Sequence, residues 1–278
     1  MKRVVTIQDI SCLGKCSLTV ALPTISAMGV ECAIIPTAVL STHTAFFKGF
    51  TFRDLSEDIS KIQDHWVKEE FDFDAIYTGY LGSFEQIDMM KRFIDTFKKE
   101  ETKVIVDPAM ADNGKLYTGF SEEFALYMRT LCNKADVILP NLTEAAFLLG
   151  REMNLKPSEE EVQEILRELV SQGTKVAILT GISLGEGKLG AYGYDREQDK
   201  FFSYMGEELP VKYHGTGDIY ASAFTGALTL GFTMEESIAI AADFVVESIK
   251  KTQEDPKGNW YGVNFEQAIP MLVERIKR

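Results

Sequence analysis

The sequence predicts a three-layer α/β protein in which helices cover both faces of a central, mostly parallel, doubly wound sheet. Two observations support this. Short apolar runs alternate with longer amphipathic segments from residue 3 to about residue 180, which is typical of βαβ units. After Thr180, short runs separated by glycines replace this pattern and predict a small antiparallel extension of the sheet.

The predicted strands are almost continuously apolar and β-branched, as expected where both faces of a parallel sheet are covered. The parallel strands are predicted at Arg3–Ile7, Cys32–Thr37, Ala75–Thr78, Lys103–Val106, Asp136–Leu139 and Lys175–Leu179. The antiparallel strands are predicted at Lys188–Tyr194 and Lys200–Tyr204, on either side of a polar turn.

Several helices between these strands have recognisable start signals. A capping-box signature, in which a Ser, Thr or Asn precedes a Glu or Gln by three residues, begins at Ser83, Ser158, Thr233 and Asn264. Behind the first three, apolar residues recur at helical spacing. The chain has no Pro/Ser-rich linker, low-complexity tract or internal repeat, so we expect a single domain over residues 1–278.

Composition limits the classes of function. The 278 residues include 29 Lys and Arg against 42 Asp and Glu, a formal net charge of −13. This acidic surplus disfavours binding to nucleic acid or an anionic membrane, but it allows a small anion in a local site. There is no long apolar run, and the four cysteines are scattered. We therefore expect a soluble, cytoplasmic protein with reduced thiols and neither a signal peptide nor a membrane span.

The most informative motif is Gly215-Thr216-Gly217-Asp218. A glycine turn at a helix start leaves backbone N–H groups unpaired, and together with the helix dipole they suit a phosphate. A carboxylate would repel a phosphate at rest. Asp218 is explained if the carboxylate accepts a proton from a hydroxyl that attacks a phosphoryl group held by those N–H groups. The alternative is that Asp218 simply caps the helix.

Two other glycine patterns lack the residues that a nucleotide motif needs. Gly14-Lys15 resembles part of a P-loop, but Asp9 and Cys16 stand where that motif requires Gly and Ser or Thr. In a dinucleotide fingerprint begun by Gly215, Tyr220 occupies the third glycine position. We therefore expect neither a Walker A motif nor a Rossmann NAD site.

Polar residues also follow two neighbouring predicted strands, where ligands bind in open α/β sheets. Asp107 and Asp112 follow one strand, and Asn141 and Glu144 follow the next. Their oxygens suit Mg²⁺ or its water shell. The alternative for Asn141 is ordinary helix capping.

A third polar segment follows the strand predicted to end at Thr37. Ser41-Thr42-His43-Thr44 offers hydroxyls and an imidazole to a polar ligand, and the alternative is a solvated loop. With the two pairs of polar residues described above, this segment predicts one site at the carboxyl edge of the sheet.

These motifs together resemble the ribokinase-like superfamily and, within it, the pyridoxal/pyridoxine/pyridoxamine (vitamin B6) kinases. The Gly-Thr-Gly-Asp motif marks the superfamily. The loop at residues 41–44 and Thr78-Gly79-Tyr80-Leu81-Gly82-Ser83 point to the vitamin B6 kinases. The remaining residues that carry the resemblance are Ile7-Gln8-Asp9, Asp107-Pro108 with Asp112, and Pro140-Asn141 with Glu144.

The resemblance implies ATP-dependent phosphorylation of the 5′-hydroxymethyl group of a B6 vitamer in vitamin salvage. It also implies Mg²⁺ as cofactor, K⁺ as a further candidate cation, and a homodimer. Asp218 would be the catalytic base, and Gly215, Thr216 and Gly217 would form the anion hole. The residues implied in substrate binding, besides Asp218, are Asp9, Ser11, His43, Thr44 and Tyr80. Those implied at ATP are Asp112, Asn141, Glu144, Thr180, Gly181, Gly215 and Gly217, with Asn141, Glu144 and Asp107 at the metal.

The sequence departs from the pattern of these kinases in two places. Many members have Ser where this chain has Asp9, and a carboxylate there favours a substrate with a protonated amine or pyridinium nitrogen, such as pyridoxamine. Many also have Thr where this chain has Leu139, which removes a side-chain oxygen from a monovalent-cation site. Lys188 and Lys212 are the nearby basic residues, and we interpret both as solvated lysines.

Two alternative functions remain at this stage. A hydroxymethylpyrimidine kinase of thiamine metabolism shares the architecture and the Gly-X-Gly-Asp motif. A non-catalytic pyridoxal-binding protein is the alternative from another class, but it would need neither Asp218 nor Glu144.

Overall fold

The computed structural model describes residues 1–44, 47–185, 187–211, 213–258 and 260–277. Within these ranges the central sheet has nine strands in the order β11-β10-β9-β8-β5-β4-β1-β2-β3. Its strands are β1 Arg3–Leu13, β2 Glu31–Thr42, β3 Phe52–Asp54, β4 Ala75–Thr78, β5 Lys103–Val106, β8 Val137–Ile138, β9 Val176–Ile182, β10 Lys188–Asp195 and β11 Lys200–Glu207. A separate hairpin consists of β6 Ala111–Asp112 and β7 Lys115–Leu116.

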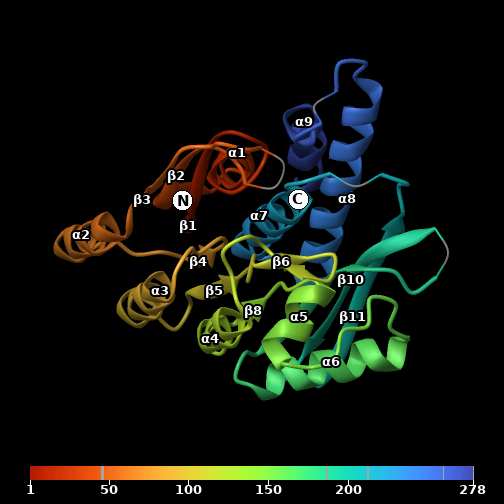
Figure 1. The fold of residues 1–278 in the computed structure, drawn as a ribbon, viewed down its shortest axis with the longest axis horizontal. Coiled ribbons are helices and arrows are strands. Elements are labelled where there is room, and N and C mark those ends of the chain that lie inside the picture. The colour runs from red at the N-terminus through yellow and green to blue at the C-terminus, as the bar shows by residue number, and fades with distance from the viewer. Residues whose placement is uncertain (45–46, 186, 212, 259, 278) are drawn as a thin grey trace.

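Six neighbouring strands of this sheet pair in parallel, namely β9, β8, β5, β4, β1 and β2. The strands β10 and β11 add an antiparallel hairpin at one edge. Helices cover both faces of the sheet (Figure 1). One apolar core lies under α2 to α6, and the other lies under α1 and α7 to α9. The three-layer α/β fold predicted from the sequence is therefore confirmed. The helices are α1 Leu18–Ala27, α2 Ser56–Lys68, α3 Phe84–Phe97, α4 Glu122–Cys132, α5 Leu142–Leu149, α6 Glu159–Ser171, α7 Thr216–Thr229, α8 Met234–Glu254 and α9 Phe265–Arg275.

The strands β4 and β5 have the predicted bounds, whereas β1 and β2 are longer than predicted. Both continue for several residues because their parallel pairing resumes after a register shift between Gln8 and Ile10. Such an irregularity can turn a side chain away from the regular alternation. Asp9 lies at this shift. Ser41 and Thr42 belong to β2 itself, so the prediction that they follow the strand was wrong.

The helix-start predictions at Ser158 and Thr233 are confirmed, since each forms a complete capping box. At Ser83 only half of the box forms, because the Gln86 side chain accepts from the Gly82 N–H instead (2.8 Å). The capping box predicted at Asn264 was wrong, although α9 does begin directly after this residue. The Asn264 side chain makes no cap and donates to Asp255 (3.2 Å).

The four cysteines are free thiols. Among the helices of the described ranges, none has the length and the apolar content that crossing a bilayer would require.

Candidate active site

A cavity of about 640 Å³ lies at the carboxyl ends of β1, β4, β5, β8 and β9. Every residue to which the resemblance assigns a role in the site lines this cavity, whereas Ser41 and Thr42 of the polar segment at residues 41–44 do not. The residues with an assigned role are Asp9, Ser11, His43, Thr44, Tyr80, Asp107, Asp112, Asn141, Glu144, Thr180, Gly181, Gly215, Thr216, Gly217 and Asp218. Segments separated by up to two hundred residues in sequence are thus brought together, while the role of each residue stays a prediction.

The start of α7 forms a concave turn that presents backbone donors to the cavity. Gly215 is the N-cap residue at φ 78°, and a Cβ there would lie 1.7 Å from the Lys15 carbonyl oxygen. This position therefore requires glycine. A Cβ on Gly217 would meet no atom within 4 Å. The first-turn N–H groups of Thr216, Gly217 and Asp218 have no acceptor within the helix. A turn of this kind fits an anion.

Asp218 is the third residue of α7, and the N-cap position is occupied by Gly215. The alternative interpretation of Asp218 as a helix cap is therefore wrong. Burial, together with the negative charge of Asp9, raises the pKa of the Asp218 carboxyl group to about 7, and the backbone N–H of Ser17 acts in the opposite direction. A carboxyl group with a pKa near neutrality is well matched to take up a proton in catalysis.

Two more buried acids belong to the same part of the cavity. Burial raises the pKa of Asp107 well above its usual value, and the charge of Asp218 raises it further. Burial and the charge of Asp107 likewise raise the pKa of Glu144 well above its usual value. In the described part of the chain, none of the three forms an ion pair with Lys or Arg. Burial and mutual repulsion thus oppose the ionised forms, and a bound cation would favour them by supplying the missing positive charge.

Asn141 and Glu144 form a capping box at the start of α5. Asn141 Oδ1 accepts from the Glu144 N–H, and Glu144 Oε2 accepts from the Asn141 N–H, both at 2.9 Å. The capping alternative is thus observed. Glu144 Oε1 also accepts from the Met110 N–H (3.1 Å), which fixes the carboxylate at the floor of the cavity.

The donor set fits Mg²⁺ held jointly with a ligand. No three His, Cys, Asp or Glu side chains of the described residues cluster closely enough to hold a metal ion by themselves. Mg²⁺ commonly takes one or two carboxylates and completes its shell with phosphate and water oxygens. Asp107 and Glu144 supply carboxylates beside the anion-binding turn. Leu139 lines the same cavity, and its side chain offers no oxygen to K⁺.

The opposite part of the cavity, toward β1 and β2, carries an acid, an imidazole and a phenol. Ser11 Oγ donates to Asp9 Oδ2 (3.1 Å), and burial raises the pKa of Asp9. His43 Nε2 donates to the Tyr261 carbonyl oxygen (3.1 Å), and burial lowers the pKa of His43. Burial and the charge of Asp9 raise the pKa of Tyr80 to about 12. This arrangement offers an aromatic surface and directed polar groups to a flat, polar ligand.

A third part of the cavity has an apolar wall that the sequence analysis missed. Its residues come from β10, from the segment after β11 and from α8, so no single sequence motif predicts them. They are Leu189, Leu209, Val211, Ala242, Val245, Val246 and Ile249. Thr180 and Gly181 lie at the edge of this wall. Lys188 is exposed at the start of β10, and Lys212 lies outside the described residues.

The sequence analysis also missed several other residues that line the cavity, among them Cys16, Ser17 and Tyr117. Burial and the charges of Glu144 and Asp112 raise the pKa of Tyr117, which places its phenol among the carboxylates. The sequence around Tyr117 reads as a polar turn, so only the hairpin β6–β7 reveals this position.

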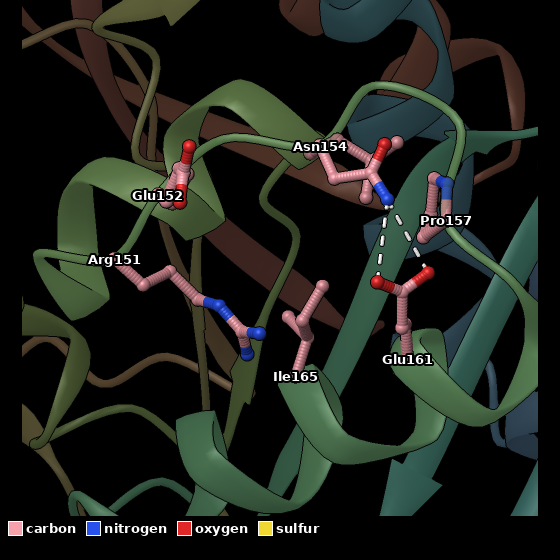
Figure 2. Close-up of a pocket in the computed structure, with 8 residues that line it drawn as sticks. Arg151, Glu152, Asn154, Pro157, Glu161 and Ile165 are labelled. Carbon is pink, nitrogen blue, oxygen red and sulfur yellow. Dashed lines mark hydrogen bonds between the residues drawn. The ribbon is translucent and has the colours of Figure 1, made fainter.

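A second, much smaller hollow lies between the end of α5 and α6 (Figure 2). Its volume is about 20 Å³, which is room for a single water molecule. Asn154 Nδ2 faces both oxygens of Glu161 at 3.3 Å (Figure 2), so these polar groups satisfy each other. The large cavity is the candidate active site.

The sequence model of the phosphomethylpyrimidine kinase family matches residues 18–262, which include the predicted site residues from His43 to Asp218 but not Asp9 and Ser11. The chain belongs to this family.

Solved structures agree with this assignment. A Bacteroides thetaiotaomicron protein described as a phosphomethylpyrimidine kinase is 39% identical, with a TM-score of 0.93 over 98% of this chain and 93% of its own. A second crystal form of it, solved with pyridoxal, gives 38% identity and a TM-score of 0.92. Pyridoxal kinase from Lactobacillus plantarum is 29% identical, with a TM-score of 0.90 over 99% and 97% of the two chains. The ribokinase-like fold and the resemblance to vitamin B6 kinases are therefore confirmed.

Curated relatives include both thiamine-pathway and vitamin B6 proteins. The bifunctional thiamine biosynthesis protein ThiDN of Methanocaldococcus jannaschii is 28% identical over 260 residues, which are 90% of this chain and 54% of that protein. The chain thus spans about half the length of this relative. A pyridoxine/pyridoxal/pyridoxamine kinase of Bordetella avium is 26% identical over 90% of this chain and 85% of its own.

Proposed function

We propose that this protein transfers the γ-phosphoryl group of ATP to the 5′-hydroxymethyl group of a B6 vitamer (pyridoxal, pyridoxamine or pyridoxine), giving the 5′-phosphate and ADP. The observation that carries the proposal is the order of groups along one cavity. In the sheet, the ends of β5 and β8, where Asp107 and Asn141 follow, lie between β1 with Asp9 and β10 with the start of the apolar wall. Asp218 and the anion-binding turn line the same cavity. The pyridoxal-bound relative at 38% identity supports the choice of vitamer.

In this mechanism Asp218 and the start of α7 act on the same reacting centre. The hydroxymethyl oxygen attacks the γ-phosphorus in line, Asp218 accepts the hydroxyl proton, and the bond from phosphorus to the β–γ bridging oxygen breaks to release ADP. The N–H groups of Thr216, Gly217 and Asp218 stabilise the negative charge of the transferring group. No covalent enzyme intermediate is needed, since positioning and charge stabilisation supply the acceleration.

Asp107 and Glu144, with Asn141 beside them, would hold Mg²⁺ together with the ATP phosphates. When bound, Mg²⁺ supplies positive charge that offsets the phosphate oxygens and the buried carboxylates. On the acceptor side, Asp9, His43 and Tyr80 would orient the pyridine ring, with Ser11 and Thr44 at its edge. Leu139 argues against a side-chain contribution to K⁺ binding. The homodimer stays a prediction from the resemblance.

A second acceptor is favoured by the family model itself, whose description names phosphomethylpyrimidine kinase. Hydroxymethylpyrimidine, like the B6 vitamers, is a six-membered nitrogen heteroaromatic ring that bears a primary alcohol. The same base and anion-binding turn would serve both substrates, so Asp9, His43 and Tyr80 would decide between them.

The experiment is an acceptor panel under one set of conditions. ADP release is measured with Mg²⁺ and ATP and, in turn, with pyridoxal, pyridoxamine, pyridoxine and hydroxymethylpyrimidine. The proposal predicts the highest kcat/KM for a B6 vitamer and a product heavier by one phosphoryl group. A higher kcat/KM for hydroxymethylpyrimidine would transfer the proposal to that substrate. Ligand binding without ADP release would support a pyridoxal-binding protein instead.

A further inference from the structure

The loop Gly14–Ser17 connects the proposed reacting centre to the C-terminal helix. On one side the Lys15 carbonyl oxygen lies so close to the Gly215 turn that any Cβ there would stand 1.7 Å away. On the other side, a Cβ on Gly262 would lie 2.2 Å from Lys15 Cβ. Lys15 is therefore packed between Gly215 at the start of α7 and Gly262 before α9, at positions where a larger residue would collide with it.

The end of the Lys15 side chain is held by α9. Its ammonium group pairs with the Glu266 carboxylate and lies 5.3 Å from the centre of the Phe265 ring. The Lys15 side chain is 15% exposed, while that of Glu266 is 52% exposed. Neither residue is among those that line the cavity in the described part of the chain, so this ion pair does not face the substrates.

The loop ends in a backbone conformation that its surroundings must maintain. Ser17 has φ 51° and ψ −136°, a region sparsely populated by residues other than glycine. The backbone N–H of the same residue favours the ionised form of the Asp218 carboxyl group and so lowers its pKa, and both residues line the cavity. At the start of the loop, Thr19 Oγ1 donates to the carbonyl oxygens of Gly14 (3.1 Å) and Cys16 (2.8 Å). Thr19 thus ties the loop to α1, and Lys15 ties it to α9.

We propose that the Lys15–Glu266 ion pair is a positioning device that holds the loop against the Gly215 turn and keeps the Ser17 N–H on the Asp218 carboxylate. The inference rests on the proposed function in one respect, namely that Asp218 acts on the substrate hydroxyl. Loss of the pair lets Ser17 leave its strained conformation, so the carboxylate and the anion-binding turn lose their fixed relation. Displacements of about 1 Å at a reacting centre can lower turnover by up to about a hundredfold.

Steady-state kinetics of four variants test this positioning role. Lys15→Met removes the charge but keeps a long side chain over Phe265, Glu266→Gln breaks the pair from outside the cavity, and Lys15→Arg preserves the pair. The matched control is Lys200→Met, which breaks the Lys200–Glu235 ion pair between β11 and α8, away from the cavity. We expect Lys15→Met and Glu266→Gln to lower kcat about tenfold with both KM values within twofold. Lys15→Arg and Lys200→Met should keep kcat within twofold of wild type.

Three kinetic outcomes would overturn the proposal. Wild-type kcat in Glu266→Gln would show that the pair positions nothing. A rise in the KM for ATP confined to Lys15→Met would make Lys15 a direct phosphate contact. An equal loss of kcat in Lys200→Met would show a general effect of breaking ion pairs. Asp218→Asn, assayed in parallel, distinguishes the role of Asp218 as base from the positioning role of the Lys15–Glu266 pair. Turnover in Asp218→Asn would refute the base, whereas an inactive Asp218→Asn beside a fully active Glu266→Gln would refute the positioning role alone.

Amide hydrogen exchange gives a readout independent of turnover. If the ion pair keeps the Ser17 N–H on the Asp218 carboxylate, this amide should exchange at least tenfold faster in Lys15→Met and Glu266→Gln than in wild type, with Lys200→Met unchanged. Unaltered protection of Ser17 in both variants would contradict the proposal, whatever the kinetics.

Discussion

Replacement of Asp218 by Asn separates the chemistry of this carboxylate from its place in the fold. The amide has nearly the same size and keeps an oxygen that can accept the Ser17 N–H, so α7 and its turn should remain intact. It cannot take up the proton of the substrate hydroxyl. Loss of a positioned general base lowers turnover by about a hundred- to ten-thousandfold, and we expect a loss in that range with the affinity for ATP unchanged.

The same substitution has a predictable effect on stability. Burial raises the pKa of Asp218 from 3.8 to about 7, so the folded state holds this proton more tightly than the unfolded state. The ionised carboxylate therefore costs stability, and the cost grows as pH rises from about 4 to about 7. At 1.36 kcal/mol per pKa unit the upper value is about 4 kcal/mol. Water in the open cavity screens the charge, so we expect Asn to gain about 1–2 kcal/mol at pH 8 and nothing at pH 4.

Two measurements check this prediction together: ADP release in the presence of pyridoxal or pyridoxamine, and chemical denaturation of wild type and Asp218→Asn at pH 5 and pH 8. An inactive variant that binds ATP normally and is at least as stable as wild type at pH 8 agrees with the reasoning. Turnover within tenfold of wild type would refute the role of Asp218 as base. An equally active but less stable variant would refute the electrostatic argument as well.

The remaining predictions concern the pH profile, the turn, the metal and the acceptor. Because Asp218 must be ionised to accept a proton, kcat should rise through about pH 7, and a flat profile between pH 5.5 and 8.5 would contradict this. Gly215→Ala should destabilise the protein by about 1–3 kcal/mol in thermal unfolding and lower kcat at least tenfold, because the φ of 78° and the Lys15 carbonyl oxygen exclude a Cβ. Wild-type stability of this variant would refute the described geometry of the turn. Glu144→Gln should raise the Mg²⁺ concentration for half-maximal rate about tenfold, and an unchanged Mg²⁺ titration would remove Glu144 from the metal site. Asp9→Ser should lower the preference for pyridoxamine over pyridoxal about tenfold in kcat/KM, and an unchanged ratio would exclude charge selection by Asp9.

The fold was predictable to a large extent because its parallel strands are buried on both faces. The bounds of β4 and β5 follow from their apolar content alone. The extensions of β1 and β2 were missed because polar residues such as Asp9 and Ser11 interrupt the apolar pattern, while backbone pairing to the neighbouring strand continues regardless of side chain. The single-domain organisation stays a prediction.

The candidate site was predictable where a residue follows a strand or opens a helix, as Asp107 and Gly215 do. Sequence reasoning failed where the signal depends on tertiary contacts. The part played by Ser17 follows from a backbone N–H that meets Asp218 across the fold, and the place of Tyr117 follows from the hairpin β6–β7. The interpretation of Asp218 as a cap failed because a glycine in the left-handed conformation shifted the helix start by three residues.

The proposal that Asp218 and the start of α7 act together on the substrate hydroxyl and the γ-phosphate is best tested by a structure of the protein with pyridoxamine and a non-hydrolysable ATP analogue. We expect the 5′-oxygen within hydrogen-bond distance of the Asp218 carboxylate and the γ-phosphate on the N–H groups of residues 216–218. The pyridine ring should lie between Asp9, His43 and Tyr80. A γ-phosphate bound away from α7, or a ring whose hydroxymethyl group points away from Asp218, would contradict it.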